Sequence, residues 1–131
     1  MKKDSVVYHS NIFPCIHTMY PLHNSSTDGL WKSVGKIAPS ETYQLPLYSV
    51  DWASSRTDHD CFVCTGSDGC IRIYREIQSS FTDTPSFAID ACVSQTHFSE
   101  ANCIRWHPID GTKLVSCGDD GLIKIWRYEC S

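Results

Sequence analysis

One pattern occurs twice in the chain, first as Cys61-Phe-Val-Cys-Thr-Gly-Ser-Asp-Gly-Cys-Ile-Arg-Ile-Tyr-Arg75 and again as Lys113-Leu-Val-Ser-Cys-Gly-Asp-Asp-Gly-Leu-Ile-Lys-Ile-Trp-Arg127. Matching positions, such as Tyr74 and Trp126, stand 52 residues apart. A shorter match precedes each copy, Tyr48-Ser-Val-Asp-Trp52 and Asn102-Cys-Ile-Arg-Trp106, at a step of 54. A fixed repeat of this kind is typical of proteins built from stacked supersecondary units.

Each copy contains short apolar runs rich in Val, Ile, Trp and Cys, separated by turn residues, which is a pattern typical of β-strands. The pairs Asp68-Gly69 and Asp120-Gly121 suit tight hairpin turns, because glycine adopts a positive φ at little cost. Ser86-Phe-Ala-Ile-Asp90 alternates apolar and polar residues and supplies a fourth strand. We therefore expect antiparallel β-structure without helix over residues 43–129, in the form of four-stranded propeller blades.

The composition narrows the classes of function. The 131 residues carry 11 Lys and Arg against 15 Asp and Glu, a net charge of -4, without a basic cluster, which argues against nucleic acid as a partner. An apolar run long enough to cross a membrane is absent, and Asp4, His9 and Pro14 interrupt any secretory signal. The sequence therefore predicts an intracellular protein that binds no membrane, and its 8 cysteines are expected to be reduced thiols.

The end of the second copy, Asp120-Gly-Leu-Ile-Lys-Ile-Trp126, resembles the end of a WD repeat, with Arg127 in place of the usual second Asp. The longer stretches His97-Phe-Ser-Glu-Ala-Asn-Cys-Ile-Arg-Trp-His-Pro108 and Leu114 to Trp126 are similar to the final blade of the cytosolic iron-sulfur protein assembly WD-repeat family. The first copy is similar to that family's penultimate blade. The resemblance implies an all-β WD40 β-propeller fragment of about two four-stranded antiparallel blades with an incomplete ring.

This resemblance also implies a domain layout. Residues 43–91 would form one WD blade, and residues 97–131 the last WD blade, which lacks its fourth strand. Residues 31–42 would hold the outer strand of a preceding blade and a linker, whereas residues 1–30 resemble nothing in the family and are expected to be poorly ordered. A seven-bladed ring needs about 300 residues at roughly 40 to 45 per blade, so we expect a fragment of a longer propeller.

By resemblance, a WD blade holds a hydrogen-bonded tetrad of His, Ser or Thr, Asp and Trp. In the second copy these positions are His97, Ser116, Asp120 and Trp126, a full set. In the first copy the same offsets give a degenerate tetrad, Tyr43, Cys64, Asp68 and Tyr74, in which only the Asp matches. Buried polar groups need partners, so the full tetrad is expected to connect its strands by satisfying all four groups.

The sequence gives little support for a metal site or a catalytic site. Cys61 and Cys64 would point to opposite faces of a strand and could not converge on one metal ion. Cys103 and His107 share one side of a strand, but His107 is expected to be solvated. Asp119 and Asp120 could be taken for an acid-base pair of carboxylates, but the side chains of adjacent turn residues diverge. The sequence therefore predicts no metal, no cofactor and no catalytic residues.

The resemblance implies a non-catalytic scaffold of the targeting complex that matures cytosolic and nuclear iron-sulfur proteins. Its partners would be a HEAT-repeat adaptor and a small α+β subunit, in the cytoplasm and also the nucleus. Another WD-repeat interaction module, such as a substrate receptor of a ubiquitin ligase, is the alternative. Candidate rim residues for partner binding are Tyr48, Glu100, Asn102, Arg105 and Asp119.

Overall fold

Antiparallel strands make up the part of the chain that the structure describes. A computed structural model places residues 6–10, 13–20, 32–37, 45–53, 60–77 and 85–129. Within these ranges there are ten strands and no helix. The strands are β1 (Val6–Ser10), β2 (Phe13–Tyr20), β3 (Lys32–Ile37), β4 (Leu47–Trp52), β5 (Cys61–Gly66), β6 (Ile71–Ile77), β7 (Ser86–Val93), β8 (Ala101–Trp106), β9 (Lys113–Gly118) and β10 (Ile123–Arg127).

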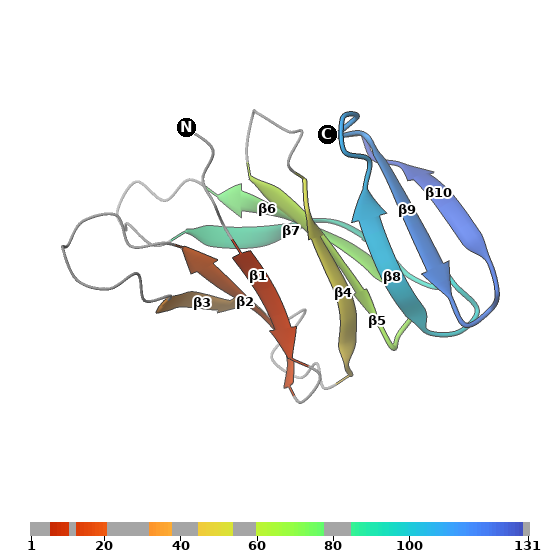
Figure 1. The fold of residues 1–131 in the computed structure, drawn as a ribbon, viewed down its shortest axis with the longest axis horizontal. Coiled ribbons are helices and arrows are strands. Elements are labelled where there is room, and N and C mark those ends of the chain that lie inside the picture. The colour runs from red at the N-terminus through yellow and green to blue at the C-terminus, as the bar shows by residue number, and fades with distance from the viewer. Residues whose placement is uncertain are drawn as a thin grey trace.

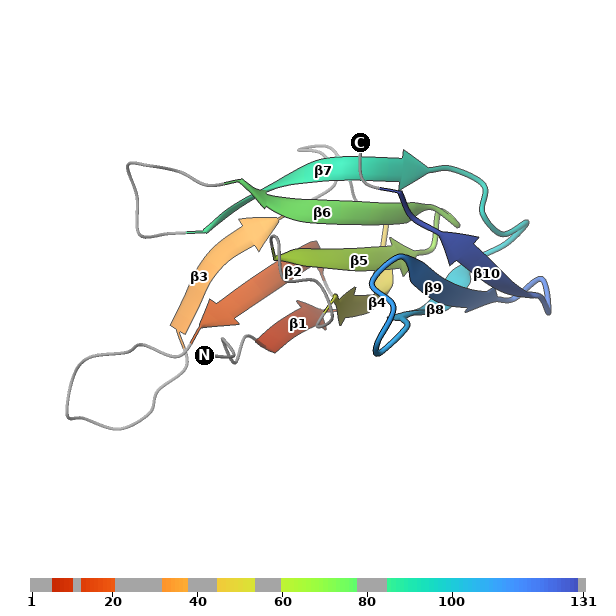
Figure 2. The same ribbon diagram turned by 90° about the horizontal axis from the view of Figure 1, so that it is seen from above.

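The strands form three separate sheets (Figure 1). Their orders are β1-β2-β3, β4-β5-β6-β7 and β10-β9-β8, and every neighbouring pair is antiparallel. Figure 2 shows the same sheets from above, with β4 to β7 between the other two. The predicted fold class is confirmed, since the described strands form antiparallel sheets of three or four strands without a helix, in an arrangement that does not close.

The two Asp-Gly turns have the predicted backbone conformation. Gly69 has a φ of 64° and Gly121 a φ of 74°, in the left-handed region that favours glycine. In each turn the glycine N–H donates to a carbonyl three residues earlier, Gly66 in the first copy at 3.0 Å and Gly118 in the second at 3.1 Å. These turns join β5 to β6 and β9 to β10, so each copy contains the same kind of hairpin.

The first sheet lies where the sequence suggested little structure. Poor order was expected for residues 1–30, but β1 and β2 form there and pair with each other, and β2 pairs in turn with β3. The expectation for residues 1–30 as a whole stays a prediction, since only residues 6–10 and 13–20 of this range are described. Strand-favouring residues such as Val, Tyr, Phe and Ile are frequent in both segments, and a pairing partner supplied by β3 lets them form a sheet. Nothing in the repeat pattern indicated this pairing.

The buried apolar residues form two hydrophobic clusters, one on each face of the second sheet. The repeat-interface cluster lies between the second and third sheets and consists of Ala53, Cys61, Val63, Ile71, Ile73, Ile104, Trp106, Leu114 and Tyr128. The other cluster lies on the opposite face of the second sheet and consists of Leu47, Phe62, Cys64 and Tyr74, with Ile37, Val50, Trp52 and Phe87 packed against it. Buried apolar side chains therefore lie on both faces of the second sheet. In the described residues, no helix is long and apolar enough to cross a membrane.

Candidate functional site

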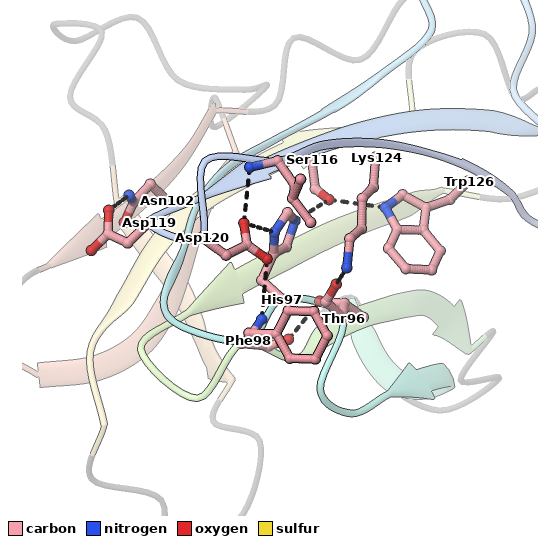
Figure 3. A network of polar contacts seen from close by, with 11 residues as sticks. Thr96, His97, Phe98, Asn102, Ser116, Asp119, Asp120, Lys124 and Trp126 are labelled. Carbon is pink, nitrogen blue, oxygen red and sulfur yellow. Dashed lines mark hydrogen bonds and ion pairs between the residues drawn. The ribbon is translucent and has the colours of Figure 1, made fainter.

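The four tetrad side chains of the second copy form one hydrogen-bonded chain (Figure 3). The indole N–H of Trp126 donates to Ser116 Oγ at 2.9 Å. Ser116 Oγ lies 2.8 Å from His97 Nε2, and His97 Nδ1 lies 2.9 Å from Asp120 Oδ1. Because the indole can only donate, the hydroxyl hydrogen is available to Nε2, and the imidazole hydrogen on Nδ1 is directed at the carboxylate. Every polar side-chain group of the tetrad has a hydrogen-bond partner.

Four different segments supply these side chains. His97 belongs to the loop before β8, Ser116 to β9, Asp120 to the β9–β10 turn and Trp126 to β10. The His97 ring packs so closely against Gly118 that a Cβ there would lie 2.9 Å from ring atoms. Glycine at this position therefore makes room for the imidazole between the loop and β9.

The carboxylate of Asp120 has several hydrogen-bond donors. Besides His97, the backbone N–H groups of Phe98 and Leu122 donate to it, both at 3.1 Å. Burial alone would raise the pKa of Asp120, but these hydrogen bonds outweigh it and lower the pKa to about 2. The carboxylate therefore stays ionised at neutral pH and fixes the loop, the turn and the start of β10 to one another.

The first copy replaces this chain with other contacts. Tyr43 lies outside the described residues. Asp68 forms an ion pair with Arg72, whose position corresponds to that of Lys124 in the second copy. Burial opposes ionisation of Asp68, but hydrogen bonds from Arg72 and the Cys70 backbone lower its pKa below the ordinary value. An ion pair within one hairpin thus occupies the place where the second copy uses a histidine from the preceding loop.

Aromatic stacking fills the rest of the corresponding face in the first copy. Phe62 stacks on Tyr74 with ring centroids 5.0 Å apart and on Trp52 at 5.6 Å. Phe87 meets Phe62 edge-on at 5.2 Å. Cys64, the counterpart of Ser116, is fully buried, and burial raises its thiol pKa to about 12. This thiol is an apolar packing group and not a nucleophile.

The two copies are joined along β4 and β8, which lie side by side in Figure 1. The hydroxyl of Ser49 accepts from the Ile104 N–H at 3.1 Å, and the carboxylate of Asp51 accepts from the Trp106 N–H at 2.6 Å. These N–H groups belong to the edge of β8 that faces away from β9. Sequence reasoning missed this junction, although the alternation of Ser49 and Asp51 with apolar residues in β4 is a signal for it.

Of the five predicted rim residues, two bind the neighbouring copy. Arg105 is exposed and donates to Ser49 Oγ at 3.1 Å and to the Val50 carbonyl at 3.2 Å. Glu100 is half-buried and accepts from Ser67 Oγ at 2.8 Å. Both side chains therefore help to hold the two copies together.

The other three rim residues are placed differently. Asn102 and Asp119 are both exposed, and the amide of Asn102 donates to the Asp119 carboxylate. Tyr48 is half-buried on β4, and no hydrogen bond within the described ranges joins it to the other four. The structure thus brings Asn102 and Asp119 together and leaves Tyr48 apart.

Phe98 is a surface feature that sequence reasoning missed. Its side chain is 91% exposed, although it follows His97, which is buried. The loop is held by the bond from the Phe98 N–H to Asp120, and Lys124 Nζ lies 5.4 Å from the centroid of the phenyl ring. Aromatic residues, Phe among them, are enriched in the cores of protein interfaces, so this exposed ring is a candidate contact for a partner.

In the portion of the chain that is placed, no three His, Cys, Asp or Glu side chains gather in a way that could hold a metal ion. Cys61 lies in the repeat-interface cluster, whereas Cys64 lies in the cluster on the other face of the sheet. These two thiols therefore point apart.

Comparison with known proteins adds two findings. The family profile of the WD domain, G-beta repeat, matches residues 91–127, which hold all of the tetrad. The chain is 35% identical over 103 residues to the probable cytosolic iron-sulfur protein assembly protein ciao1-B of Salmo salar, covering 79% of this chain and 29% of that protein.

Two further relatives have the same description. A probable cytosolic iron-sulfur protein assembly protein of Nematostella vectensis is 35% identical over 99 residues, covering 75% of this chain and 28% of the relative. The protein of that description from Homo sapiens is 30% identical over 105 residues, covering 80% of this chain and 30% of the relative. The chain thus contains a WD repeat, resembles these proteins over most of its length, and spans about three tenths of theirs.

Proposed function

We propose that the chain acts as a non-catalytic part of a WD-repeat scaffold in cytosolic iron-sulfur protein assembly. The observation that carries this proposal is the similarity to proteins named for that assembly over 79% of the chain. The profile of the WD domain matches residues 91–127, the segment in which His97, Ser116, Asp120 and Trp126 form a connected blade. A scaffold needs rigid sheets that present fixed loops, and this blade provides them.

The arrangement of polar side chains supports a binding role. Asp120 and His97 are occupied by structural hydrogen bonds, and Cys64 is a buried thiol with a raised pKa. Exposed groups are found instead at the ends of the sheets, where Phe98, Asn102 and Asp119 lie on loops, turns and strand ends. We assign partner binding to this rim. Glu100, Arg105 and Tyr48 would contribute mainly by fixing the shape of the rim.

The partners follow from the same proposal. They are a HEAT-repeat adaptor and a small α+β subunit, and the complex would deliver clusters to cytosolic and nuclear client proteins. In this scheme the chain holds no cluster of its own and positions other proteins. Its place of action would be the cytoplasm and also the nucleus.

Affinity purification tests this function. The tagged full chain is expressed in cells, and co-purified proteins are measured by quantitative mass spectrometry. We expect subunits of the iron-sulfur targeting complex to be enriched. The double variant Asn102→Ala, Phe98→Ala should reduce their recovery at least fivefold, whereas Ile77→Ala, an exposed residue at the far end of β6, should leave it unchanged.

Two results would contradict the proposal. Recovery of ubiquitin-ligase subunits in place of assembly subunits would favour the other class of WD-repeat module. The second result is equal recovery of the assembly subunits by the wild-type chain and the rim double variant, while circular dichroism shows that both are folded. That result would place the binding site outside the rim.

A further inference from the structure

Two cysteines of the third sheet lie directly opposite each other on neighbouring strands. Cys103 on β8 and Cys117 on β9 are partners in the antiparallel register, and both are free and half-buried. Opposite residues of an antiparallel pair point to the same face of the sheet, with Cβ atoms about 4.5 to 5.5 Å apart. In the strands that the structure describes, no other two cysteines are opposite each other. The register of one hairpin brings these two thiols together, whatever else packs on the sheet.

The backbone contacts of β8 show which kind of cross-strand pair this is. The N–H groups of Ile104 and Trp106 point away from β9, toward side chains of β4. Because peptide groups alternate in direction along a strand, those of Cys103 point to β9, and the two cysteines form a hydrogen-bonded pair. The Cα atoms of such a pair are about 5.5 Å apart, within the range of about 4.4 to 6.8 Å that a disulfide spans. A bond between the two sulfurs can therefore form while the strands stay paired.

A disulfide at this position is strained. The Cβ atoms of a hydrogen-bonded pair lie at the wider end of the cross-strand range, whereas a relaxed disulfide needs them about 3.5 to 4.5 Å apart, so β8 and β9 must approach by up to about 1 Å. A β-bulge between Ala101 and Cys103 makes the backbone of β8 irregular at this point, where it can take up the movement. A strained disulfide is easier to reduce than a relaxed one. The geometry is therefore that of a reversible bond.

The first copy has no counterpart of this thiol pair. The equivalent positions hold Ser49 and Thr65, which are paired in the same register and are buried. The Ser49 hydroxyl accepts a hydrogen bond from the backbone of β8, and the Thr65 hydroxyl donates to the Cys70 carbonyl at 2.8 Å. Two hydroxyl groups are thus sufficient for packing and hydrogen bonding in this row of the sheet. The architecture of the repeat does not require thiols at these positions, so the pair has a chemistry of its own.

We propose that Cys103 and Cys117 are a reversible dithiol site that closes to a disulfide in the presence of hydrogen peroxide. One thiolate attacks a peroxide oxygen, so that a sulfur–oxygen bond forms, the oxygen–oxygen bond breaks and hydroxide leaves as water after taking up a proton. The second thiolate attacks the sulfenic sulfur, so that the disulfide forms and the second hydroxide also leaves as water. The two sulfurs together lose two electrons, and the peroxide gains them. A dithiol reductant reopens the bond by thiol–disulfide exchange.

The site lies next to the tetrad and the end of the hairpin. Cys117 directly precedes Gly118, which packs against the His97 ring. The bulge beside the other cysteine contains Asn102, which is hydrogen-bonded to Asp119, and the Asp119 N–H donates to a backbone carbonyl of the loop before β8 at 3.0 Å. Approach of β8 and β9 at the bulge should disturb this last bond. Closure of the disulfide should therefore speed hydrogen exchange of the Asp119 amide.

Mass spectrometry of the full chain tests the pair directly. The reduced chain is treated with a slight excess of hydrogen peroxide, remaining thiols are blocked with iodoacetamide, and tryptic peptides are separated without reductant. Cleavage after Arg105 and Lys113 puts the two cysteines in different peptides. We expect these peptides to be linked, with a mass lower by two hydrogen atoms than their sum, and to separate on addition of dithiothreitol. Alkylation of Cys117 should be largely lost after peroxide.

Matched variants keep the test specific. Cys103→Ser and Cys117→Thr introduce the residues that the first copy has at these positions, so both variants should fold. Each should abolish the link and restore alkylation of the remaining thiol. Cys92, an exposed thiol on β7, shares a tryptic peptide with Cys103, so Cys92→Ser is the control and should form the link like the wild type. In glutathione buffers the link should be absent when the reduced form is in excess and appear as the share of glutathione disulfide rises.

Several outcomes would overturn the site. Separate sulfinic acids at the two cysteines without a link, or a link that joins two chains on a non-reducing gel, exclude the intramolecular pair. A link that survives Cys103→Ser belongs to another thiol. A bond that stays closed in excess reduced glutathione is a permanent disulfide and excludes a reversible site. An unchanged exchange rate of the Asp119 amide excludes the coupling to the end of the hairpin.

Discussion

At the scale of single residues, Ser116 is the junction of the tetrad. Its one hydroxyl accepts from Trp126 and is placed to donate to His97, so it joins β10 to the loop before β8. A residue with a hydroxyl can do both at once, whereas the Cys64 thiol at the same position of the first copy is surrounded by aromatic rings. The copy with a serine at this position thus has a polar, hydrogen-bonded sheet face, and the copy with a cysteine has an apolar, aromatic one.

Replacement of Trp126 should be among the more damaging changes in the second copy. Trp126→Ala removes a large packed ring and leaves Ser116 short of a donor, for a loss of about 3 kcal/mol in the free energy of unfolding. Trp126→Phe keeps most of the packing and should cost only about 1 kcal/mol. Urea denaturation of both variants measures this difference. A Trp126→Phe variant as stable as the wild type would mean that the indole N–H has no role.

Asp120 makes stability depend on acidity. Its pKa is about 2 in the folded state, against an ordinary value of 3.8, so the unfolded chain binds a proton first as the pH falls. The stability that this carboxylate contributes is complete above the ordinary pKa and is lost as the pH falls through about 2. Asp68 and Asp110, whose pKa values are also lowered, add to the same loss.

The contribution of Asp120 is isolated by comparison with Asp120→Asn. Denaturation midpoints of the wild type and the variant should differ at pH 6 and converge as the pH approaches 2. Parallel curves over this range would show that Asp120 is not the titrating group.

At the scale of elements, the two equivalent hairpins of the chain differ in their surroundings. Gly69 and Gly121 have the same kind of backbone conformation, but only Gly69 is enclosed. A Cβ at Gly69 would lie 2.8 Å from the Ser99 carbonyl oxygen and 3.0 Å from that of His97, whereas nothing lies within 4 Å of one at Gly121. The loop before β8 rests on the first hairpin, and the Thr96 N–H donates to the Gly69 carbonyl at 2.9 Å.

Alanine at the two turn glycines should therefore have unequal effects. Gly121→Ala introduces only the strain of a left-handed backbone, about 1 to 2 kcal/mol. Gly69→Ala introduces the same strain and also displaces the loop that holds His97, so it should cost more. Guanidinium denaturation of both variants gives the comparison. A smaller loss at Gly69 would mean that the loop does not rest on this hairpin.

At the scale of the whole molecule, the second and third sheets share one core. The repeat-interface cluster takes Val63, Ile71 and Ile73 from one sheet and Ile104, Trp106 and Leu114 from the other. Asp51 and Ser49 add hydrogen bonds to the free edge of β8. Neither sheet can therefore lose its packing without exposing the other.

A change in one sheet should accordingly loosen the other. Trp106→Ala in β8 should lower the hydrogen-exchange protection of amides in β5 and β6, because it opens the shared core. Ile109→Ala, at a loop residue that is 84% exposed, should leave these amides unchanged. Loss of protection confined to β8, β9 and β10 would show that the two copies are stable independently.

The local features of each copy could be predicted from the sequence because they depend on nearby residues. The short apolar runs between turn residues predict β5, β6, β9 and β10, and the Asp-Gly pairs predict turns that only glycine fits easily. The resemblance placed the tetrad residues at their positions, and the observed distances bring all four together. In each case the partners are set by strand register and by turns of a few residues.

Contacts between distant segments could be decided only by the tertiary structure. The bond from Asp51 to the Trp106 backbone, the substitution of an Asp68–Arg72 ion pair for a histidine, and the pairing of β1 with β2 and β3 all depend on which surfaces meet. The exposure of Ile123 and Ile125 has the same origin, since their counterparts Ile71 and Ile73 are also isoleucines, stand in a similar local sequence and are buried. Burial is a property of the packed molecule, so identical residues in a repeat can have opposite environments.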